Sequence, residues 1–288
     1  MNTQQMYGMS LNQIAKAIAS VGHKRTILVE GHMGNGKTSI LKMLADMFPD
    51  EEFGIHLNKP LIIMWDEWTK ANQSVKNGTL VTMLERMVGT KKLPEGSIQF
   101  ATGNLGAEGV GDTIPAHARN RMTIVTARKS TSDELIEYGI NHEWEPSVLG
   151  FIREFPQILQ GFEDVKDPTD NPYINHPKAQ RKSFITPRSL ESSSDILKQR
   201  HLFDDHSLTA LLIGTIGDRG ALDMMAFVKL ADQLPSLQSI KDDPLNAKVP
   251  DSASAVCMTV YRALGAMNRE WVDNWVTYME RLDKEAQG

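Results

Sequence analysis

The nine residues GHMGNGKTS, from Gly31 to Ser39, decide the fold because they join an apolar run to a helical pattern. The run Thr26-Ile-Leu-Val29 that precedes them is apolar and β-branched, which predicts a strand. After them, apolar residues recur at helical spacing until Pro49: Ile40, Met43, Leu44 and Met47. The order strand, glycine-rich loop, helix follows from this pattern.

The loop fits the pattern G-x-x-x-x-G-K-T, with Gly31 at its start and Gly36-Lys37-Thr38 at its end. Glycines let consecutive backbone N–H groups turn toward a phosphate, and the helix N-terminus adds partial positive charge. Lys37 then reaches the β- and γ-phosphates, and the Thr38 hydroxyl binds Mg²⁺. The alternative is a turn that caps a helix without a ligand, but the flanking strand and helix favour a nucleoside triphosphate. The predicted contacts are Gly31, Met33, Gly34, Asn35, Gly36, Lys37, Thr38 and Ser39.

A second apolar run, Leu61-Ile-Ile-Met-Trp65, ends in two carboxylates, Asp66 and Glu67. It predicts a buried strand of a parallel sheet with both acids at its carboxyl end. Asp66 would hold Mg²⁺ through water, and Glu67 would polarise the attacking water. A polar turn that merely ends a strand is the alternative. The sequence contains no NKxD segment to specify guanine, so the pattern indicates hydrolysis of ATP.

Further patterns extend this organisation along the chain. Ser10 with Gln13 predicts the capped start of a helix, and Ile98–Thr102 and Met122–Thr126 predict two more strands. Three prolines among Asp and Asn between about 163 and 183 predict a linker. We therefore expect an α/β domain over 1–165 and a linker with a smaller helical domain over 166–288.

Four segments together resemble the AAA+ ATPases, and within them the MoxR-like branch. They are GHMGNGKT, LIIMWDEWTKANQSVKNGTLVTMLERMVG, FATGNLGAEGVGDTIPAHARNRM and ITPRSL, spread over most of residues 25–195. The resemblance implies a parallel five-stranded sheet flanked by helices, followed by an α-helical lid. It implies a water-orienting role for Asn104, an arginine finger at Arg121 with Arg119 as the alternative, and a second sensor at Arg188.

The resemblance also implies partners. A ring or helical homo-oligomer, such as a hexamer, would let the finger of one subunit complete the site of the next, and ATP hydrolysis would remodel or activate a client protein. The client could carry a von Willebrand factor A-type domain. Two alternatives stay open: a nucleic-acid-binding AAA+ initiator or helicase loader that acts on DNA, and a scaffold that binds ATP and hydrolyses little.

One spacing departs from the family pattern. Asp66 follows Lys37 by only 29 positions, and this interval must hold a helix, a strand near Phe53–Leu57 and the strand that ends at Asp66. Little room is left for the helix that carries a pore-facing insertion in MoxR-like relatives. Either a compact variant or a missing segment accounts for this spacing.

Composition describes an ordinary globular chain of 288 residues, 41% hydrophobic and 23% charged. Its single cysteine, Cys257, cannot form an internal disulfide, and MNTQQMYGMS has no leader pattern, so we expect a cytoplasmic protein. The net charge of −5 argues against broad affinity for nucleic acid. An aromatic stripe near the C-terminus, Trp271, Trp275 and Tyr278, is interpreted as core rather than as a docking face.

Overall fold

The computed structural model describes residues 7–48, 59–104, 114, 116–179, 181–231 and 234–282. The chain forms two compact units, Met1–Lys129 and Ser130–Gly288. The domain boundary predicted at residue 165 falls inside the second unit. Each unit has its own hydrophobic core, and each is described by itself.

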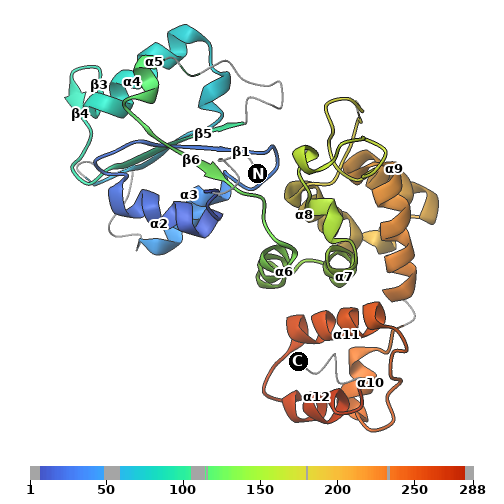
Figure 1. Cartoon of the computed structure of the whole chain (residues 1–288). Helices are drawn as coiled ribbons and strands as arrows, with labels where there is room; N and C mark the ends of the chain where they lie inside the picture. Colours follow the sequence, from blue (N-terminus) through green and yellow to red (C-terminus); the bar gives the residue numbers. More distant parts are fainter. Residues whose placement is uncertain are drawn as a thin grey trace. The chain divides into compact units, whose positions relative to one another are not determined.

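The first unit is built on a parallel sheet with the strand order β2-β5-β1-β6 among the described residues (Figure 1). The four strands match the apolar runs of the sequence: β1 Ile27–Gly31, β2 Ile62–Trp65, β5 Ile98–Asn104 and β6 Thr123–Ala127. The α/β class with a parallel sheet is thus confirmed. The further strand predicted near Phe53–Leu57 lies outside the described residues.

Helices cover both faces of this sheet because successive strand residues point to opposite sides. Ile27 and Val29 of β1 pack in a cluster with α2 (Leu11–Val21) and α3 (Ser39–Met47). Leu28 packs on the other face with α4 (Gln73–Glu85) and α5 (Ala116–Arg119), which lie together above the sheet in Figure 1. Apolar residues on both faces are what a parallel sheet covered by two layers requires.

The start of α2 shows the predicted local signal. The Ser10 hydroxyl accepts the Gln13 N–H at 3.3 Å, and the Gln13 side-chain oxygen accepts the Ser10 N–H at 2.9 Å. This reciprocal cap satisfies two donors that the helix itself leaves unpaired. The capping prediction is confirmed.

Between β2 and β5 the chain makes a short 3-10 turn, η1 (Trp68–Lys70), then α4 and a small antiparallel hairpin. The hairpin pairs β3 (Met87–Val88) with β4 (Lys91–Lys92). Gly89 at its turn has a φ of 59°, a left-handed conformation that costs glycine little. The residues of β2 are half-buried rather than buried, because β2 is the edge strand of the described sheet.

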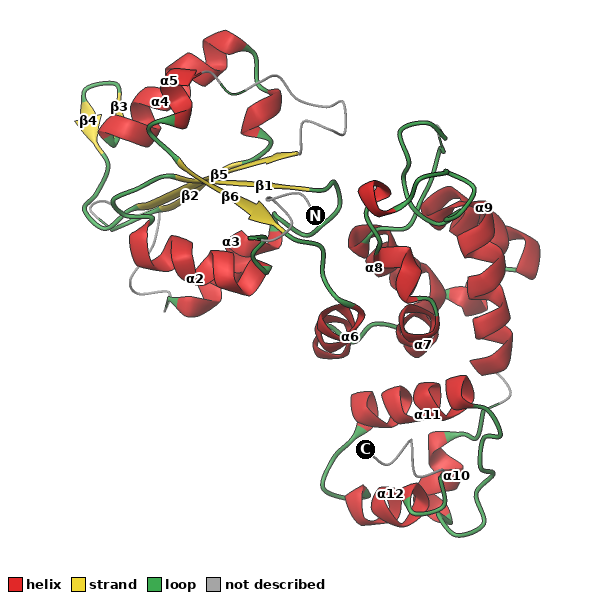
Figure 2. Cartoon of the chain, in the orientation of Figure 1, coloured by secondary structure: helices red, strands yellow, loops and turns green. Residues whose placement is uncertain are grey.

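The second unit is mainly helical (Figure 2). A single apolar cluster joins residues of its first four α-helices. These helices are α6 (Ser132–Asn141), α7 (Pro146–Glu154), α8 (Pro187–Lys198) and α9 (Asp205–Ala231). Within the described residues, the 3-10 turns η3 (Pro156–Leu159), η4 (Phe162–Asp164) and η5 (Arg200–Leu202) lie between them.

Helix α9 has a kink at Gly217, where φ is 79°. A Cβ at this position would lie 2.7 Å from the carbonyl oxygen of Ser183, so the close approach requires glycine. The Ser183 hydroxyl in turn donates to the carbonyl of Gly214 at 2.6 Å. The kink therefore joins α9 to the chain just before α8.

The described residues of 166–186, named the proline-rich segment here, pack into this unit. Arg181 donates to the carbonyls of Ile174 and Pro168, each at 2.6 Å. The Tyr173 hydroxyl donates to Asp223 of α9 at 2.7 Å. What the composition predicts as a linker is thus a loop packed against the second unit.

A separate small core lies between α10 (Leu237–Asp242), α11 (Ala253–Ala266) and α12 (Val272–Met279). Trp271, Trp275 and Tyr278 belong to it, with 4%, 7% and 0% of their surfaces exposed. The interpretation of the aromatic stripe as core is confirmed.

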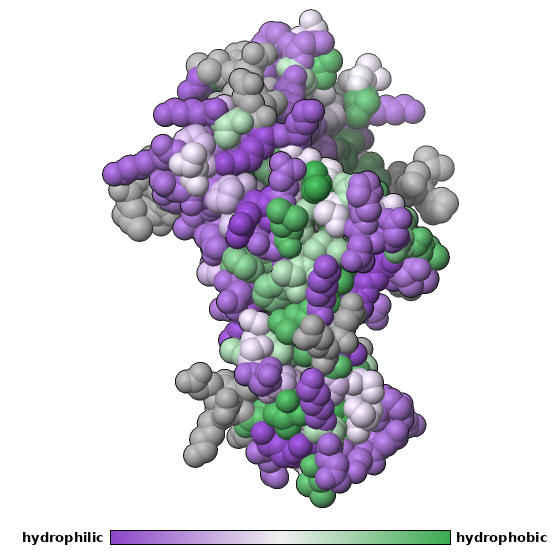
Figure 3. Space-filling view, turned by 90° about the vertical axis from the view of Figure 1, so that its right-hand side faces the viewer, coloured by the Kyte–Doolittle hydropathy of each residue, from purple (hydrophilic) through white to green (hydrophobic). Residues whose placement is uncertain are grey.

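Polar side chains cover most of the face drawn in Figure 3, with apolar side chains gathered in patches among them. This agrees with a chain in which charged residues make up 23% of the sequence. Within the described residues, no helix combines the length and the apolar character that crossing a membrane requires.

Candidate functional site

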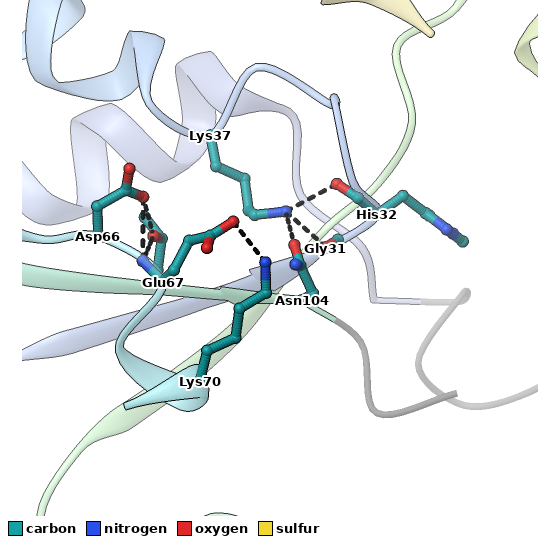
Figure 4. A network of polar contacts seen from close by, with 8 residues as sticks. Gly31, His32, Lys37, Asp66, Glu67, Lys70 and Asn104 are labelled. Atoms are coloured by element: carbon teal, nitrogen blue, oxygen red, sulfur yellow. Dashed lines mark hydrogen bonds and ion pairs between the residues drawn. The ribbon is translucent and has the colours of Figure 1, made fainter. Parts of the chain in front are cut away.

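The carboxyl ends of three parallel strands bring the predicted residues to one edge of the sheet. Gly31 of β1 lies opposite Asn104 of β5, and Trp65 of β2 lies opposite Ala101. Asp66 directly follows Trp65, so the carboxylates, the glycine-rich loop and Asn104 share this edge (Figure 4). Ligands of open α/β sheets bind at such an edge.

The glycine-rich loop 31–39 owes its shape to two glycines. Gly34 and Gly36 have φ values of 70° and 71°, in the left-handed region that other residues seldom adopt. The chain then turns through Lys37 and Thr38 into α3, which begins at Ser39. The Thr38 side chain is exposed and makes no capping bond to the helix, so its hydroxyl is available to a ligand.

Lys37 is buried, with 9% of its surface exposed, and its ammonium is held inside the loop. Its Nζ donates to the carbonyl oxygens of Gly31 at 2.6 Å and His32 at 2.7 Å, and to Asn104 Oδ1 at 3.1 Å (Figure 4). A buried ammonium needs such acceptors, and phosphate oxygens could replace them because charge-assisted hydrogen bonds are the stronger ones.

Asn104 links the loop to the neighbouring strand. It is 6% exposed, its Oδ1 accepts from Lys37, and its Nδ2 has no hydrogen-bond partner among the described residues. Leaving a buried donor unsatisfied costs about 1–3 kcal/mol. An acceptor from a ligand would remove this cost.

The carboxylate pair after β2 is organised by a residue that the sequence analysis missed. The Thr102 hydroxyl donates to Asp66 Oδ1 at 2.6 Å and accepts the Glu67 N–H at 2.9 Å. Thr102 stands two positions before Asn104 on β5, so its side chain shares a face with Asn104. That spacing is the signal that could have identified it.

Glu67 has a left-handed backbone, with φ 49° and ψ 32°. Its carboxylate forms an ion pair with Lys70 of η1, with 2.7 Å between Oε1 and Nζ (Figure 4). Asp66 and Glu67 are both exposed. The pair thus presents two carboxylates at the edge, one held by Thr102 and the other by Lys70.

The two candidate finger arginines differ in their surroundings. Arg119 Nε donates to the carbonyl of Ile114 at 2.8 Å. Its guanidinium also partly offsets the effect of burial, which raises the pKa of Glu30 above its usual 4.5. Arg121 is exposed, and its side chain makes no hydrogen bond or ion pair with the part of the chain that the structure describes.

Arg121 and the glycine-rich loop occupy opposite ends of the strands. Arg121 precedes β6, whose Thr123 pairs with Ile27 at the amino end of β1, while the loop follows Gly31 at the carboxyl end. Four residue steps of a parallel strand separate these ends by roughly 13 Å. Arg121 is therefore not part of the edge site of its own chain.

Arg188 belongs to the second unit. It is the second residue of α8, after Pro187, and its side chain is exposed. Thr186 caps this helix by accepting the Ser189 N–H at 3.1 Å. Arg188 thus follows a proline at the start of a helix, the position that the resemblance implies, and its role as a sensor stays a prediction.

The residues at the edge fit a nucleoside triphosphate with Mg²⁺. The glycine-rich loop and Lys37 offer donors to phosphate, and Thr38 and Asp66 offer oxygen ligands of the type Mg²⁺ prefers. Asn104 Nδ2, which has no partner within the described part of the chain, offers one more donor. No family model matches this chain, and no curated protein matches it.

Proposed function

We propose that this protein binds ATP with Mg²⁺ and hydrolyses it, as an AAA+ ATPase of the MoxR-like type. The observation that carries the proposal is the meeting of Lys37, Asp66 and Asn104 at the carboxyl edge of one parallel sheet. A glycine-rich loop alone would suit many phosphate-binding proteins. A carboxylate pair and a buried asparagine beside it suit hydrolysis in particular.

The side chains divide the work between binding and chemistry. Lys37 would exchange its carbonyl partners for terminal phosphate oxygens. Thr38 and Asp66 would hold Mg²⁺, which would supply positive charge to the phosphates. Glu67 accepts a proton from the attacking water, and Asn104 Nδ2 donates to that water or to the γ-phosphate. Glu67 must leave its ion pair with Lys70 to do so.

The exposed Arg121, remote from its own loop, supports assembly into a homo-oligomer. In a hexameric ring or a helical filament, its guanidinium would reach the site of the adjacent subunit and stabilise charge on the γ-phosphate. Hydrolysis would then couple to motion between subunits, and we propose that this motion remodels or activates a client protein. We propose Arg188, in the helical unit, as the second sensor.

The first experiment measures ATP hydrolysis by the full chain with and without DNA, with Lys37→Ala as the inactive reference. ATPase activity that DNA leaves unchanged supports the proposal. Stimulation by DNA would favour the initiator or helicase-loader alternative, and a very low rate under both conditions, even at concentrations where the chain assembles, would favour a scaffold.

A mixing experiment tests the shared site. Arg121→Ala should bind ATP nearly normally but lose on the order of a thousandfold in turnover. Lys37→Ala subunits cannot use ATP themselves but can still lend Arg121 to a neighbour, so mixing the two variants should restore part of the activity. If the mixture co-assembles and stays inactive, or if Arg121→Ala alone is fully active, Arg121 is not the finger.

A further inference from the structure

Asn35, one of the predicted phosphate contacts, buries its side chain against the end of β6, so its backbone N–H is the group that a phosphate would meet. Its side chain is 3% exposed, and its Nδ2 donates to the carbonyl oxygen of Arg128 at 2.8 Å. Arg128 follows β6 directly and lies in the stretch 127–131, named the connector here, which leads to α6 and the second unit. The loop is thus hydrogen-bonded to the chain that leaves the sheet.

The N-terminal segment holds the connector from another side. The Met9 N–H donates to the Thr126 carbonyl at 2.9 Å, and the Arg128 N–H donates to the Met9 carbonyl at 3.0 Å. A Cβ at Gly8 would lie 3.0 Å from the Arg128 Cβ, so the two segments are closely packed. The Arg128 peptide therefore has its N–H fixed by Met9 and its C=O fixed by Asn35.

The side-chain amide of Asn35 suits the hydrogen bond to the Arg128 carbonyl. The Asn35 Oδ1 is buried and has no partner among the described residues, which is a cost that a small apolar residue would avoid. The flanking Gly34 and Gly36, both with left-handed φ, set the backbone of the loop on either side of this inward-pointing amide. The bond to Arg128 is what an amide at this position provides.

We propose that Asn35 is a positioning residue that couples occupancy of the glycine-rich loop to the connector. The inference rests on the proposed function, because it requires a nucleotide phosphate to bind the loop. When phosphate draws the loop N–H groups inward and restricts them, the Asn35 amide holds the Arg128 carbonyl more tightly and the connector becomes more ordered. The start of the second unit thereby responds to the nucleotide.

Hydrogen exchange on the full chain tests this, with ADP and Mg²⁺ as the probe. Two regions are followed: the connector, through the Arg128 amide, and the loop itself. In the parent protein, ADP should slow exchange in both, by about twofold to tenfold in the connector, as one hydrogen bond allows. In Asn35→Ala and Asn35→Leu, ADP should still slow exchange in the loop but no longer in the connector.

The empty protein provides a second measurement that does not depend on nucleotide binding. Without ADP, connector exchange should be about twofold to tenfold faster in both Asn35 variants than in the parent, because the Arg128 carbonyl has lost its donor. Asn77→Ala serves as the matched control, since Asn77 is exposed on α4 and its side chain accepts a hydrogen bond from Gln73 of the same helix.

The outcomes separate the two proposals. Connector exchange in the Asn35 variants without ADP that equals the parental rate would overturn the coupling role of Asn35. Connector exchange that ADP still slows in these variants would overturn it as well. Parent protein that binds ADP without any change in the connector also overturns it. If ADP fails to bind the parent at all, calorimetry and the loop amides will show this, and the proposed function itself fails.

Discussion

The glycine-rich loop and the proline-rich segment both lack regular secondary structure, yet they differ in how far their buried polar groups are hydrogen-bonded. In the loop and at the strand edge beside it, Asn35 Oδ1 and Asn104 Nδ2 lack partners among the described residues, and Lys37 rests on loop carbonyls. In the proline-rich segment, Arg181 bonds to two carbonyls and Tyr173 to Asp223.

The glycine-rich loop therefore keeps polar groups that a ligand could bind, whereas the polar groups of the proline-rich segment stabilise its conformation. Unsatisfied buried groups, and a lysine whose ammonium donates to neutral carbonyl and amide oxygens, leave interactions that a ligand can improve. A loop whose polar groups already have good partners gains nothing from a ligand and instead stabilises the helices around it. Substitutions should therefore affect chemistry in the first region and stability in the second.

The largest effect should come from Glu67→Gln, which keeps the shape of the side chain and removes its ability to accept a proton. Turnover should fall by about 10²–10⁴-fold, the contribution of a general base, while ATP stays bound. Phosphate release and nucleotide retention measure the two effects separately. Glu85→Gln, on the exposed end of α4, is the control. Hydrolysis at the parental rate in Glu67→Gln would remove Glu67 from the mechanism.

Lys37→Ala should weaken ATP binding on the order of 100-fold, because it removes charge-assisted hydrogen bonds to the phosphates. Calorimetric titration in a Glu67→Gln background measures the affinity without hydrolysis. Lys42→Ala, an exposed lysine of α3, should bind ATP like its parent. Equal affinity in both lysine variants would show that the loop does not hold a nucleotide through Lys37.

Arg181→Ala should lower the free energy of unfolding by about 2 kcal/mol, because the carbonyls of Ile174 and Pro168 lose a charged donor. ATP affinity should not change. Urea unfolding provides the measurement, and Lys182→Ala, an exposed neighbour, should shift stability by less than about 0.5 kcal/mol. A large loss of ATP binding in Arg181→Ala would contradict the division between the two regions.

The smallest effect concerns Glu30. Burial raises the pKa of its carboxyl above 4.5, and the nearby charge of Arg119 partly offsets this rise. A raised carboxyl pKa stabilises the folded state below the unfolded pKa, and this contribution is lost as pH rises through the folded pKa. Glu30→Gln should thus be slightly more stable than the parent at about pH 8 and no more stable at about pH 4, as urea midpoints at both pH values would show. The opposite trend would mean that Arg119 outweighs burial.

Local patterns in the sequence were sufficient to predict most strands and helices of the first unit. The strand, loop and helix around Gly31–Ser39, the strand ending at Trp65 and the capped start at Ser10 appear as predicted. Each depends on side-chain alternation, glycine conformation or a cap, all of which act within a few residues. The roles of Asn104, Arg121 and Arg188 came from family resemblance and stay predictions.

Such local patterns could not predict contacts between segments that are distant in the sequence. Prolines and polar residues predicted a linker between about 163 and 183, but Tyr173 binds that segment to α9 through Asp223, 50 positions away. Arg181 binds two carbonyls of the segment itself. Likewise Thr102 reaches Asp66 only because β2 and β5 are neighbours, and Asn35 reaches Arg128 only because β1 pairs with β6.

The sequence therefore determined the main strands and helices of the first unit and the hydrogen-bond donors that the glycine-rich loop offers, because backbone preference and side-chain type are local properties. The tertiary structure alone decided the order of strands, the partners of the carboxylates and the link from Asn35 to the connector. Those depend on hydrogen bonds and packing between segments far apart in the chain, which form only when the sheet assembles.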